Sequence, residues 1–428
     1  MPSTQPIAAA LRSPLLPFWL VIALLPVGRS SELGTLLCLI GAILLFVRHP
    51  RALRGHAGAR LLLALLACYV GAALLSSFDA VAPGKSWGTT AGLLRYVPLG
   101  LYACFAIRRA ERLRALLFAV AVVVAFWVAD AWVQAFTGFS LGGHADAERV
   151  SGIFGADNLK LGPTLSVLAP FALWAARDRW GRTGLVLAFL LLLGPVLLAG
   201  SRAGWLCYGL VALAFAWREA GSAHRFALWC GLGLVLVGLA GTLAWRTSGR
   251  FQDRMERTLA VFADEPQGLD EALTGRPAIW RASVRMLADH PWNGVGVRGF
   301  RYAYPDYAPA NDHFVVEEAC GVGEGACHAH QVVLEVLSET GVAGLVLWLG
   351  ATFLALRAWR RQGPAARARA FPVTVALAVM LFPLNTHLAF YSAWWGLLFA
   401  WLLGLWCAAL FLEENVVETD AVMDARDA

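Results

Sequence analysis

Long apolar runs recur along almost the whole chain, and they limit the folds that it can adopt. Each has about 15 to 25 residues, and about 20 apolar residues in a helix cross the hydrocarbon core of a bilayer. Such runs fold as helices, because a bilayer offers no water to satisfy backbone N–H and C=O groups. We count twelve, at 15–28, 32–47, 61–78, 89–107, 115–136, 158–176, 185–200, 204–217, 226–245, 331–356, 370–388 and 394–412.

The balance of residue types agrees with an integral membrane protein. Of the 428 residues, 59% are hydrophobic and only 15% are charged. The sequence therefore predicts an all-α polytopic membrane protein with about 12 transmembrane helices. No small-residue cleavage pattern follows the first run, so we expect it to be retained rather than removed as a signal peptide.

Arginine placement predicts the orientation of these helices, because positive residues in short loops stay in the cytoplasm during insertion. Arginines gather in the loops after even-numbered runs, near 48–60, 108–114, 177–182, 218–225 and 357–369. In the short loops after odd-numbered runs, the Lys and Arg residues are only Arg29, Lys85, Arg149 and Arg202. We therefore expect both termini in the cytoplasm. The same rule explains the pI near 9.0, so the positive charge is no sign of nucleic-acid binding.

One connection is long enough to form a small subdomain on the non-cytoplasmic side, and function most often resides in such long loops. It separates the ninth run from the tenth. The chain then divides into spans one to nine (1–245), this loop (246–330), spans ten to twelve (331–412) and an acidic cytoplasmic tail (413–428).

The loop itself has three parts. "RFQDRMERTLAVF" (250–262) predicts an amphipathic helix. "TGRPAIWRASVRMLADHP" predicts a second helix, with an apolar stripe formed by Trp280, Val284 and Leu287. "WNGVGVRGFRYAYPDYAP" (292–309) is rich in Gly, Pro and Tyr and predicts an irregular, ordered loop.

This third part contains G-x-G-x-x-G at Gly294, Gly296 and Gly299. A dinucleotide site needs this motif between a strand and a helix of a βαβ unit. Here a helix is expected before it and an aromatic loop after it. We therefore interpret the glycines as tight backbone turns.

Ionisable and polar residues inside the spans are costly in hydrocarbon and are usually functional or paired. In the expected topology they fall in the outer half of the membrane, at the level of Arg202: Arg95, Asp130, Lys160, Asn385 and His387. A secondary transporter would more often place its site at the midplane, between two repeated halves. Arg95 and Asp130 either neutralise each other or belong to a site at this level.

"CHAHQVVLEVLSETGVAGL" (327–345) lies at the end of the long loop and the start of the tenth span. Helical spacing puts His330 on one face, with Gly341 and Gly344 below it for close helix approach. It also predicts a polar face that looks into a cavity or toward headgroups, formed by Gln331, Glu335, Ser338 and Glu339.

The chemistry of these residue types suggests group transfer from a lipid phosphate. A histidine titrates near neutrality, so His330 could accept a proton from an incoming hydroxyl. Arginines could bind a phosphate through paired hydrogen bonds and stabilise a departing anion. The alternative is that interfacial His and Arg side chains merely reach toward headgroups. Metal binding by His328 and His330 is weakly supported, because residues two apart point to opposite sides of a strand.

Four segments resemble, in order, the motifs of the bacterial O-antigen ligase and polymerase superfamily. They are "GSRAGW" (200–205), "TGRPAIW" (274–280), "HPWNGVGVRGF" (290–300) and "HAHQVVLEVLSETGVAGL" (328–345). The many-span topology and the large periplasmic loop before the last motif are similar as well. In that family Asn usually follows the second His, whereas here Gln331 does.

The resemblance implies a GT-C-type glycosyltransferase of the bacterial inner membrane, with a partly helical periplasmic loop between spans nine and ten. It implies transfer of an O-antigen glycan from undecaprenyl pyrophosphate to a hydroxyl of lipid A-core, with inversion and with no metal or other cofactor. His330 would be the base. Arg202 and Arg276 would hold the pyrophosphate, and other substrate contacts would come from Arg95, Arg281, His328 and Gln331.

Three alternatives stay open. An O-antigen polymerase or a protein O-oligosaccharyltransferase would use the same donor, fold and motifs. A lipid-linked-glycan flippase or another transporter is disfavoured by the His motif and by the clustering of polar residues at one membrane face. The apolar spans are expected to contact membrane lipids and the polyprenyl chain of the donor.

The eight cysteines fall into two groups. Those within apolar runs are expected to behave as small buried hydrophobes: Cys38, Cys68, Cys104, Cys207, Cys230 and Cys407. Cys320 and Cys327 instead flank "GVGEGA" in the outer loop, directly before His328. Because a Gram-negative periplasm is oxidising, we predict a disulfide between them.

Overall fold

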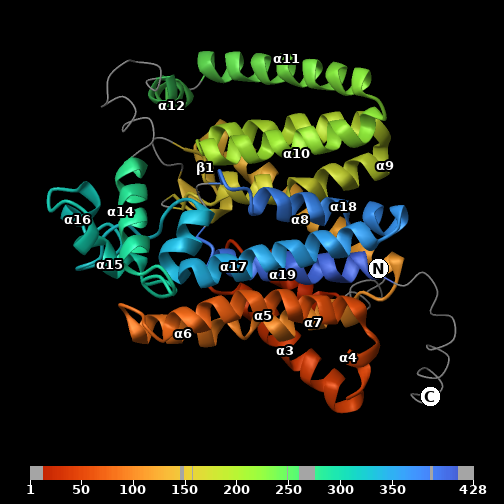
Figure 1. The fold of residues 1–428 in the computed structure, drawn as a ribbon. Helices are drawn as coiled ribbons and strands as arrows, with labels where there is room; N and C mark the ends of the chain where they lie inside the picture. The colour runs from red at the N-terminus through yellow and green to blue at the C-terminus, as the bar shows by residue number, and fades with distance from the viewer. Residues whose placement is uncertain are drawn as a thin grey trace.

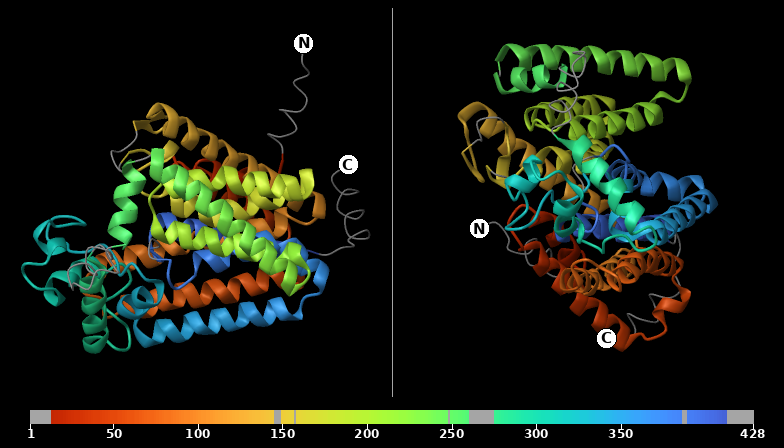
Figure 2. Two further views of the ribbon diagram at one scale, coloured as in Figure 1. Left: turned by 90° about the horizontal axis from the view of Figure 1, so that it is seen from above. Right: turned by 60° about the vertical axis from the view of Figure 1, so that its left-hand side comes forward.

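The computed structural model describes residues 13–144, 149–156, 158–247, 249–259, 275–385 and 389–412. His387, the end of the predicted 250–262 helix and the tail 413–428 lie outside these residues. The described chain is almost wholly helical, with one short β-hairpin that pairs β1 (Phe139–Ser140) with β2 (Gly143–His144). The helices pack into a bundle with a smaller group of helices at one end (Figures 1 and 2).

The bundle consists of helices from both halves of the chain. The first half supplies α2 (Leu16–Ala23), α3 (Ser31–Arg48), α4 (Ala52–Gly55), α5 (Ala57–Ser77), α6 (Pro83–Leu93), α7 (Tyr96–Ala106) and α8 (Ala110–Thr137). Later segments supply α9 (Leu161–Leu198), α10 (Arg202–Ala220), α11 (Ala223–Thr247), α17 (Val332–Arg361), α18 (Pro364–Met380) and α19 (Ala393–Leu410). The 3-10 helix η1 (Gly152–Phe154) precedes α9.

The structure supports the polytopic membrane class. Among the described residues, seven helices are long and apolar enough to cross a bilayer: α3, α5, α8, α9, α11, α17 and α19. The fourth predicted span, 89–107, is instead divided between α6 and α7, with the break at Leu94 and Arg95. Neither of these helices alone is long enough for a hydrocarbon core of about 30 Å.

Helix α9 contains two predicted spans and reverses direction between them. Gly181 has φ 66° and ψ −153°, a conformation that is not helical and that only glycine adopts readily. As a result, a Cβ atom placed on Gly162 would lie 3.0 Å from the Cβ of Ala199, at the other end of the helix. The two halves therefore run side by side as an antiparallel pair, as the spans 158–176 and 185–200 predict.

Helix α17 is kinked at Gly341, where φ is 63° and ψ is −165°. The kink releases backbone N–H groups from the helix ladder, and the preceding loop satisfies them. Val342 N donates to the carbonyl of Pro291 (2.8 Å), and Ala343 N donates to that of Trp292 (3.2 Å). The "HPWNG" turn is therefore fixed against the membrane helix that carries the histidine motif.

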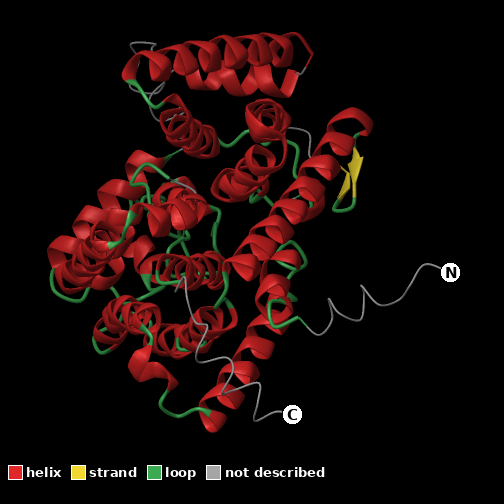
Figure 3. Cartoon of the chain, turned by 90° about the vertical axis from the view of Figure 1, so that its right-hand side faces the viewer, coloured by secondary structure: helices red, strands yellow, loops and turns green. Residues whose placement is uncertain are grey.

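Helix α19 forms the centre of the bundle, with almost every residue buried. The indole of Trp401 stacks on Phe18 of α2 and donates a hydrogen bond to the Phe18 carbonyl (2.8 Å). By contrast, α11 has no buried residue and lies at the edge of the bundle (Figure 1). Figure 3, viewed from another side, shows the helices packed around this core and the small hairpin at the periphery.

The group at the end of the bundle contains α12 (Gly249–Leu259), α14 (Arg276–Asp289), α15 (Phe300–Tyr307) and α16 (His313–Val316). Helices α14 to α16 share a separate apolar core, which includes Ile279, Met286, Phe300 and Tyr304. The prediction of an irregular loop over 292–309 is thus partly wrong, because α15 occupies its second half. A helix rather than a strand precedes Gly294, so the βαβ unit of a dinucleotide site is not formed around these glycines.

Candidate functional site

The histidine segment forms a turn between the group of helices α14 to α16 and α17. His330 has φ 52°, in the left-handed region that residues other than glycine rarely adopt. This backbone places the rings of His328 and His330 against each other, with centroids 3.9 Å apart and planes tilted by 41°. The expectation that the two side chains point to opposite sides is therefore wrong. Trp280 of α14 holds the turn by donating from its indole Nε1 to the carbonyl of Ala329 (3.2 Å).

Gln331 is the N-cap of α17, and its side-chain oxygen accepts a hydrogen bond from the N–H of Leu334. The helix therefore begins at Val332. His330 lies before the helix, so it does not share a helical face with Gly341 and Gly344 as the spacing predicts. A capping oxygen fixes the first turn of α17 and leaves the amide N–H₂ of Gln331 for other contacts.

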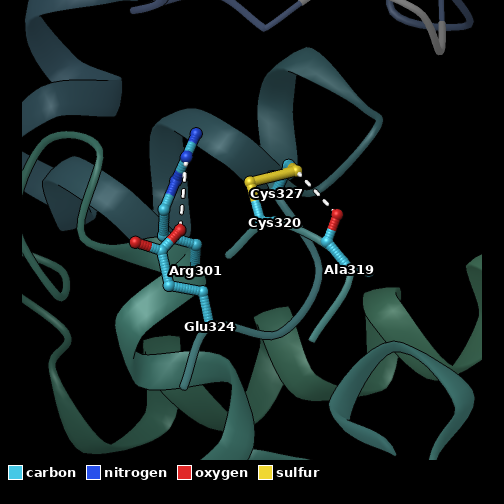
Figure 4. Close-up of a disulfide and its surroundings, with 5 residues drawn as sticks. All are labelled: Arg301, Ala319, Cys320, Glu324 and Cys327. Atoms are coloured by element: carbon cyan, nitrogen blue, oxygen red, sulfur yellow. Dashed lines mark hydrogen bonds and ion pairs between the residues drawn. A yellow bond between two sulfur atoms is a disulfide. The ribbon is translucent and has the colours of Figure 1, made fainter. Parts of the chain in front are cut away.

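Cys320 and Cys327 form a disulfide, with their Cα atoms 5.1 Å apart, which confirms the prediction (Figure 4). The bond closes a short loop that ends directly before His328. Arg301 of α15 pairs with Glu324 inside this loop (3.4 Å). The approach of the chain to the histidines is thus fixed by one covalent bond and one ion pair.

We expect mass spectrometry of non-reduced, alkylated peptides covering 311–335 to show these two cysteines linked. Replacing both by Ser should lower the free energy of unfolding by about 2 kcal/mol, because the open loop gains entropy in the unfolded state. Free alkylation of both thiols in protein purified without reductant would contradict the disulfide.

Two arginines from family-like motifs come together beside this turn. Arg202 is the first residue of α10, after the N-cap Ser201, and Arg276 is the first residue of α14. Burial, together with the nearby charge of Arg202, lowers the pKa of Arg276 to about 10. Arg276 therefore keeps its charge at neutral pH, but the folded protein holds it at a cost that a bound anion would reduce.

Helix α14 connects the arginine pair to the histidines. Arg276 and Trp280 are four residues apart, so they lie on the same side of α14. The indole of Trp280 reaches the backbone between His328 and His330. The structure thus brings Arg202, Arg276 and the histidine turn together at one end of the bundle.

Two further cationic residues approach the same place, although the motifs do not mark them as site residues. The side chain of Arg149 packs over Gly200, since a Cβ atom on Gly200 would lie 3.3 Å from the Arg149 Cγ. Lys160 precedes Gly162, which packs against Ala199 and Ser201. Its Nζ lies 5.0 Å from the ring centroid of Trp394. The sequence offered one signal for them, since the expected topology places Arg149 and Lys160 at the same side of the membrane as Arg202.

Arg281 does not join this group. It is five residues after Arg276, so it projects about 140° away around the helix. It is exposed and faces Tyr304 of α15, whose pKa it lowers against the larger effect of burial. The predicted apolar stripe of α14 is also displaced, because the buried residues are Ile279, Ala282, Ser283 and Met286 rather than Trp280, Val284 and Leu287.

Arg95 and Asp130 do not neutralise each other. Arg95 pairs with Glu32 of α3 (3.2 Å) and lies over the ring of Tyr96 (4.9 Å). Asp130 instead accepts a hydrogen bond from the N–H of Leu141, at the β-hairpin (2.9 Å). Each residue thus has a local structural contact, and their proposed mutual pairing is wrong.

The polar face predicted for α17 is not exposed to a cavity or to headgroups. Glu335, Ser338 and Glu339 are fully buried inside the protein. Their carboxylates and hydroxyl are therefore part of the packed core, in the first turns of α17 that follow the histidine turn.

The described residues contain no group of three or more His, Cys, Asp or Glu side chains placed to hold a metal ion. What they do offer is an imidazole pair on the turn that α14 contacts, and two nearby guanidinium groups at the starts of α10 and α14. Such a site combines a proton acceptor with a binding place for a multiply charged oxyanion.

Comparison with known proteins agrees with this chemistry. Residues 165–349 match the family model described as O-antigen ligase. No curated protein matches the chain. The matched segment includes Arg202, Arg276 and the histidine turn, whereas Arg95 and Arg149 precede it. Residues 165–349 thus resemble the O-antigen ligase family, and the rest of the chain lies outside the match.

Proposed function

We propose that the protein is an O-antigen ligase that transfers a glycan from undecaprenyl pyrophosphate to a sugar hydroxyl of lipid A-core. The reaction takes place at the periplasmic face of the bacterial inner membrane. The observation that carries the proposal is the juxtaposition of the arginine pair with the histidine turn, inside the segment that matches the O-antigen ligase family.

The proposed reaction is a single displacement at the anomeric carbon of the donor. The acceptor hydroxyl oxygen forms the new bond to this carbon while the bond to the pyrophosphate oxygen breaks, so the configuration inverts. His330 accepts the hydroxyl proton. The leaving undecaprenyl pyrophosphate gains the bonding electron pair and therefore one negative charge.

Arg202 and Arg276 hold the pyrophosphate and stabilise this added charge. Planar guanidinium groups match phosphate oxygens in pairs. An anion between them also offsets the burial and the nearby Arg202 charge that together lower the pKa of Arg276. In this proposal they replace the divalent cation that many glycosyltransferases use.

The accompanying topology has twelve crossings, with both termini in the cytoplasm and the loop 246–330 in the periplasm. The polyprenyl chain and the acyl chains of the acceptor remain among the apolar helices. Cysteine-labelling of positions in 275–330 in intact cells tests this orientation, since these positions should react with a membrane-impermeant reagent.

The acceptor is tested by reconstitution in proteoliposomes with labelled undecaprenyl-pyrophosphate glycan. Three acceptors are offered separately: lipid A-core, a second donor molecule and a pilin-like protein. Label in lipid A-core alone supports the ligase. Label in longer polyprenyl-linked glycan would identify a polymerase, and label in protein would identify an O-oligosaccharyltransferase.

Replacing Arg202 or Arg276 by Lys should impair transfer about a hundredfold, because a point charge cannot reproduce two parallel hydrogen bonds. Activity should survive EDTA if the arginines stand in for a metal ion. The matched control is Arg281→Lys, on the other side of α14, which should retain most activity. Full dependence on added Mg²⁺ or Mn²⁺ would overturn this part of the mechanism.

A further inference from the structure

Two buried carboxylates of α17 have no role in the reaction proposed above. Glu335 and Glu339 lie one helical turn apart and are both 0% exposed. Buried carboxyl groups cost several kcal/mol unless their oxygens are well bonded. Yet Glu335 Oε2 and Glu339 Oε1 have no hydrogen-bond partner among the described residues. The contacts of the other two oxygens indicate what these residues do.

Glu339 binds the loop that carries the "GVGVRGF" motif. Its Oε2 accepts a hydrogen bond from the N–H of Arg298 (2.9 Å), and the backbone of Phe300 also interacts with this carboxylate. Arg298 has φ 60°, a left-handed backbone conformation that is strained for a residue other than glycine. The carboxylate therefore compensates for strain at this point of the loop.

The same loop contacts α17 at two further points. Val295 N donates to the carbonyl of Ser338 (2.8 Å), and Val342 N donates to the carbonyl of Pro291 (2.8 Å). A Cβ atom on Gly294 would lie 2.5 Å from the backbone of Glu339, so the two backbones are in direct contact. The loop is thus fitted to the first turns of α17 and to the kink at Gly341.

Glu335 binds a second loop, which connects α18 to α19. Its Oε1 accepts a hydrogen bond from the N–H of Tyr391 (3.4 Å), and the backbone of Phe390 also interacts with it. The hydroxyl of Tyr69 in α5 donates to the carbonyl of Phe390 (2.7 Å). This segment ends at Ser392, the N-cap of α19.

We propose that Glu335 and Glu339 are positioning residues that fix these two outer loops to the first turns of α17, and thereby relative to His330. Each carboxylate serves one loop: Glu339 the segment 294–300, and Glu335 the segment 389–392. The catalytic part of this inference rests on the proposed function. The loop contacts themselves do not, so they can be tested without any substrate.

The test is hydrogen–deuterium exchange on the full chain in nanodiscs. In Glu339→Met the side chain keeps a similar length, but it has no oxygen to accept from backbone N–H groups. Exchange should then increase about tenfold or more in peptides covering 294–300, with 389–392 unchanged. Glu335→Met should give the reverse pattern.

Ser338→Ala is the matched control. Ser338 is equally buried on the same helix, but its hydroxyl bonds only to carbonyls of that helix. Exchange in both loops should stay as in the wild type. If a Met variant does not fold, the Asp variants keep the charge but lose the reach to the loops, and they should show the same selective increase.

Transfer assays connect the loops to catalysis. Each Met variant should lower kcat about tenfold to a hundredfold with little change in the donor KM, since misplacing groups by about 1 Å can cost a hundredfold. Increased exchange in both loops alike, or in neither, would overturn the assignment of one carboxylate to each loop. Selective exchange with unchanged kcat would overturn only the link to His330, whereas an inactive wild type would point to the wrong acceptor or function.

Discussion

Replacing His330 by Gly should abolish transfer while leaving the fold intact or slightly more stable. Glycine adopts a φ of 52° without the steric cost that histidine pays, so the turn should accept it. Loss of a general base lowers the rate by about 10² to 10⁴-fold. Initial rates with lipid A-core and thermal unfolding of the same preparations measure the two effects separately.

Two other histidine variants sharpen this result. His328→Ala should retain most activity, because His328 contacts the ring of His330 without being the expected base. His313→Ala is the matched surface control, since this exposed residue pairs with Glu317 on α16. An inactive His328 variant beside an active His330 variant would show that the base is the other imidazole. Full activity in both would remove the general-base mechanism.

The second large effect is expected at Gly341, and it concerns folding. Alanine there would need a φ of 63°, and its Cβ would overlap the carbonyl of Trp292. We expect Gly341→Ala to cost more than about 3 kcal/mol and to reduce the yield of monodisperse protein strongly. Gly350→Ala, in the same helix with nothing within 4 Å of the added Cβ, should be neutral or stabilising by up to about 1 kcal/mol.

Size-exclusion chromatography in detergent and the unfolding temperature measure this difference. Equal unfolding temperatures for the two variants would show that the "HPWNG" turn is not held against the kink. The proposed contacts of Glu339 with the same loop would then lose their support.

Local patterns in the sequence predict the helical membrane class, the pairing of Cys320 with Cys327 and the tight turns at Gly294 and Gly296. Each depends on composition or on residues close together in the chain. The antiparallel pair within α9 was also expected from two apolar runs, with Gly181 marking the reversal.

Features that depend on distant residues were not predicted. Helical periodicity predicts His330 on a helix. In the structure His330 has a left-handed backbone just before α17 begins, and periodicity carries no information on this. Periodicity likewise predicts that Glu335 and Glu339 form an exposed polar face. They are buried instead, because backbone N–H groups of loops remote in the sequence bind them. The pairing of Arg95 was missed for the same reason, since its partner Glu32 lies in another helix.

The two arginines of the site stand at the first residues of α10 and α14, and this placement has a consequence for how the anion is held. A helix start carries about half a positive charge from its unpaired N–H groups. This positive potential comes from backbone N–H groups, so replacing side chains does not remove it. A variant with both Arg202 and Arg276 changed to Ala should therefore still bind phosphate weakly. The remaining affinity should show how much of the binding of the donor's pyrophosphate comes from the backbone fold.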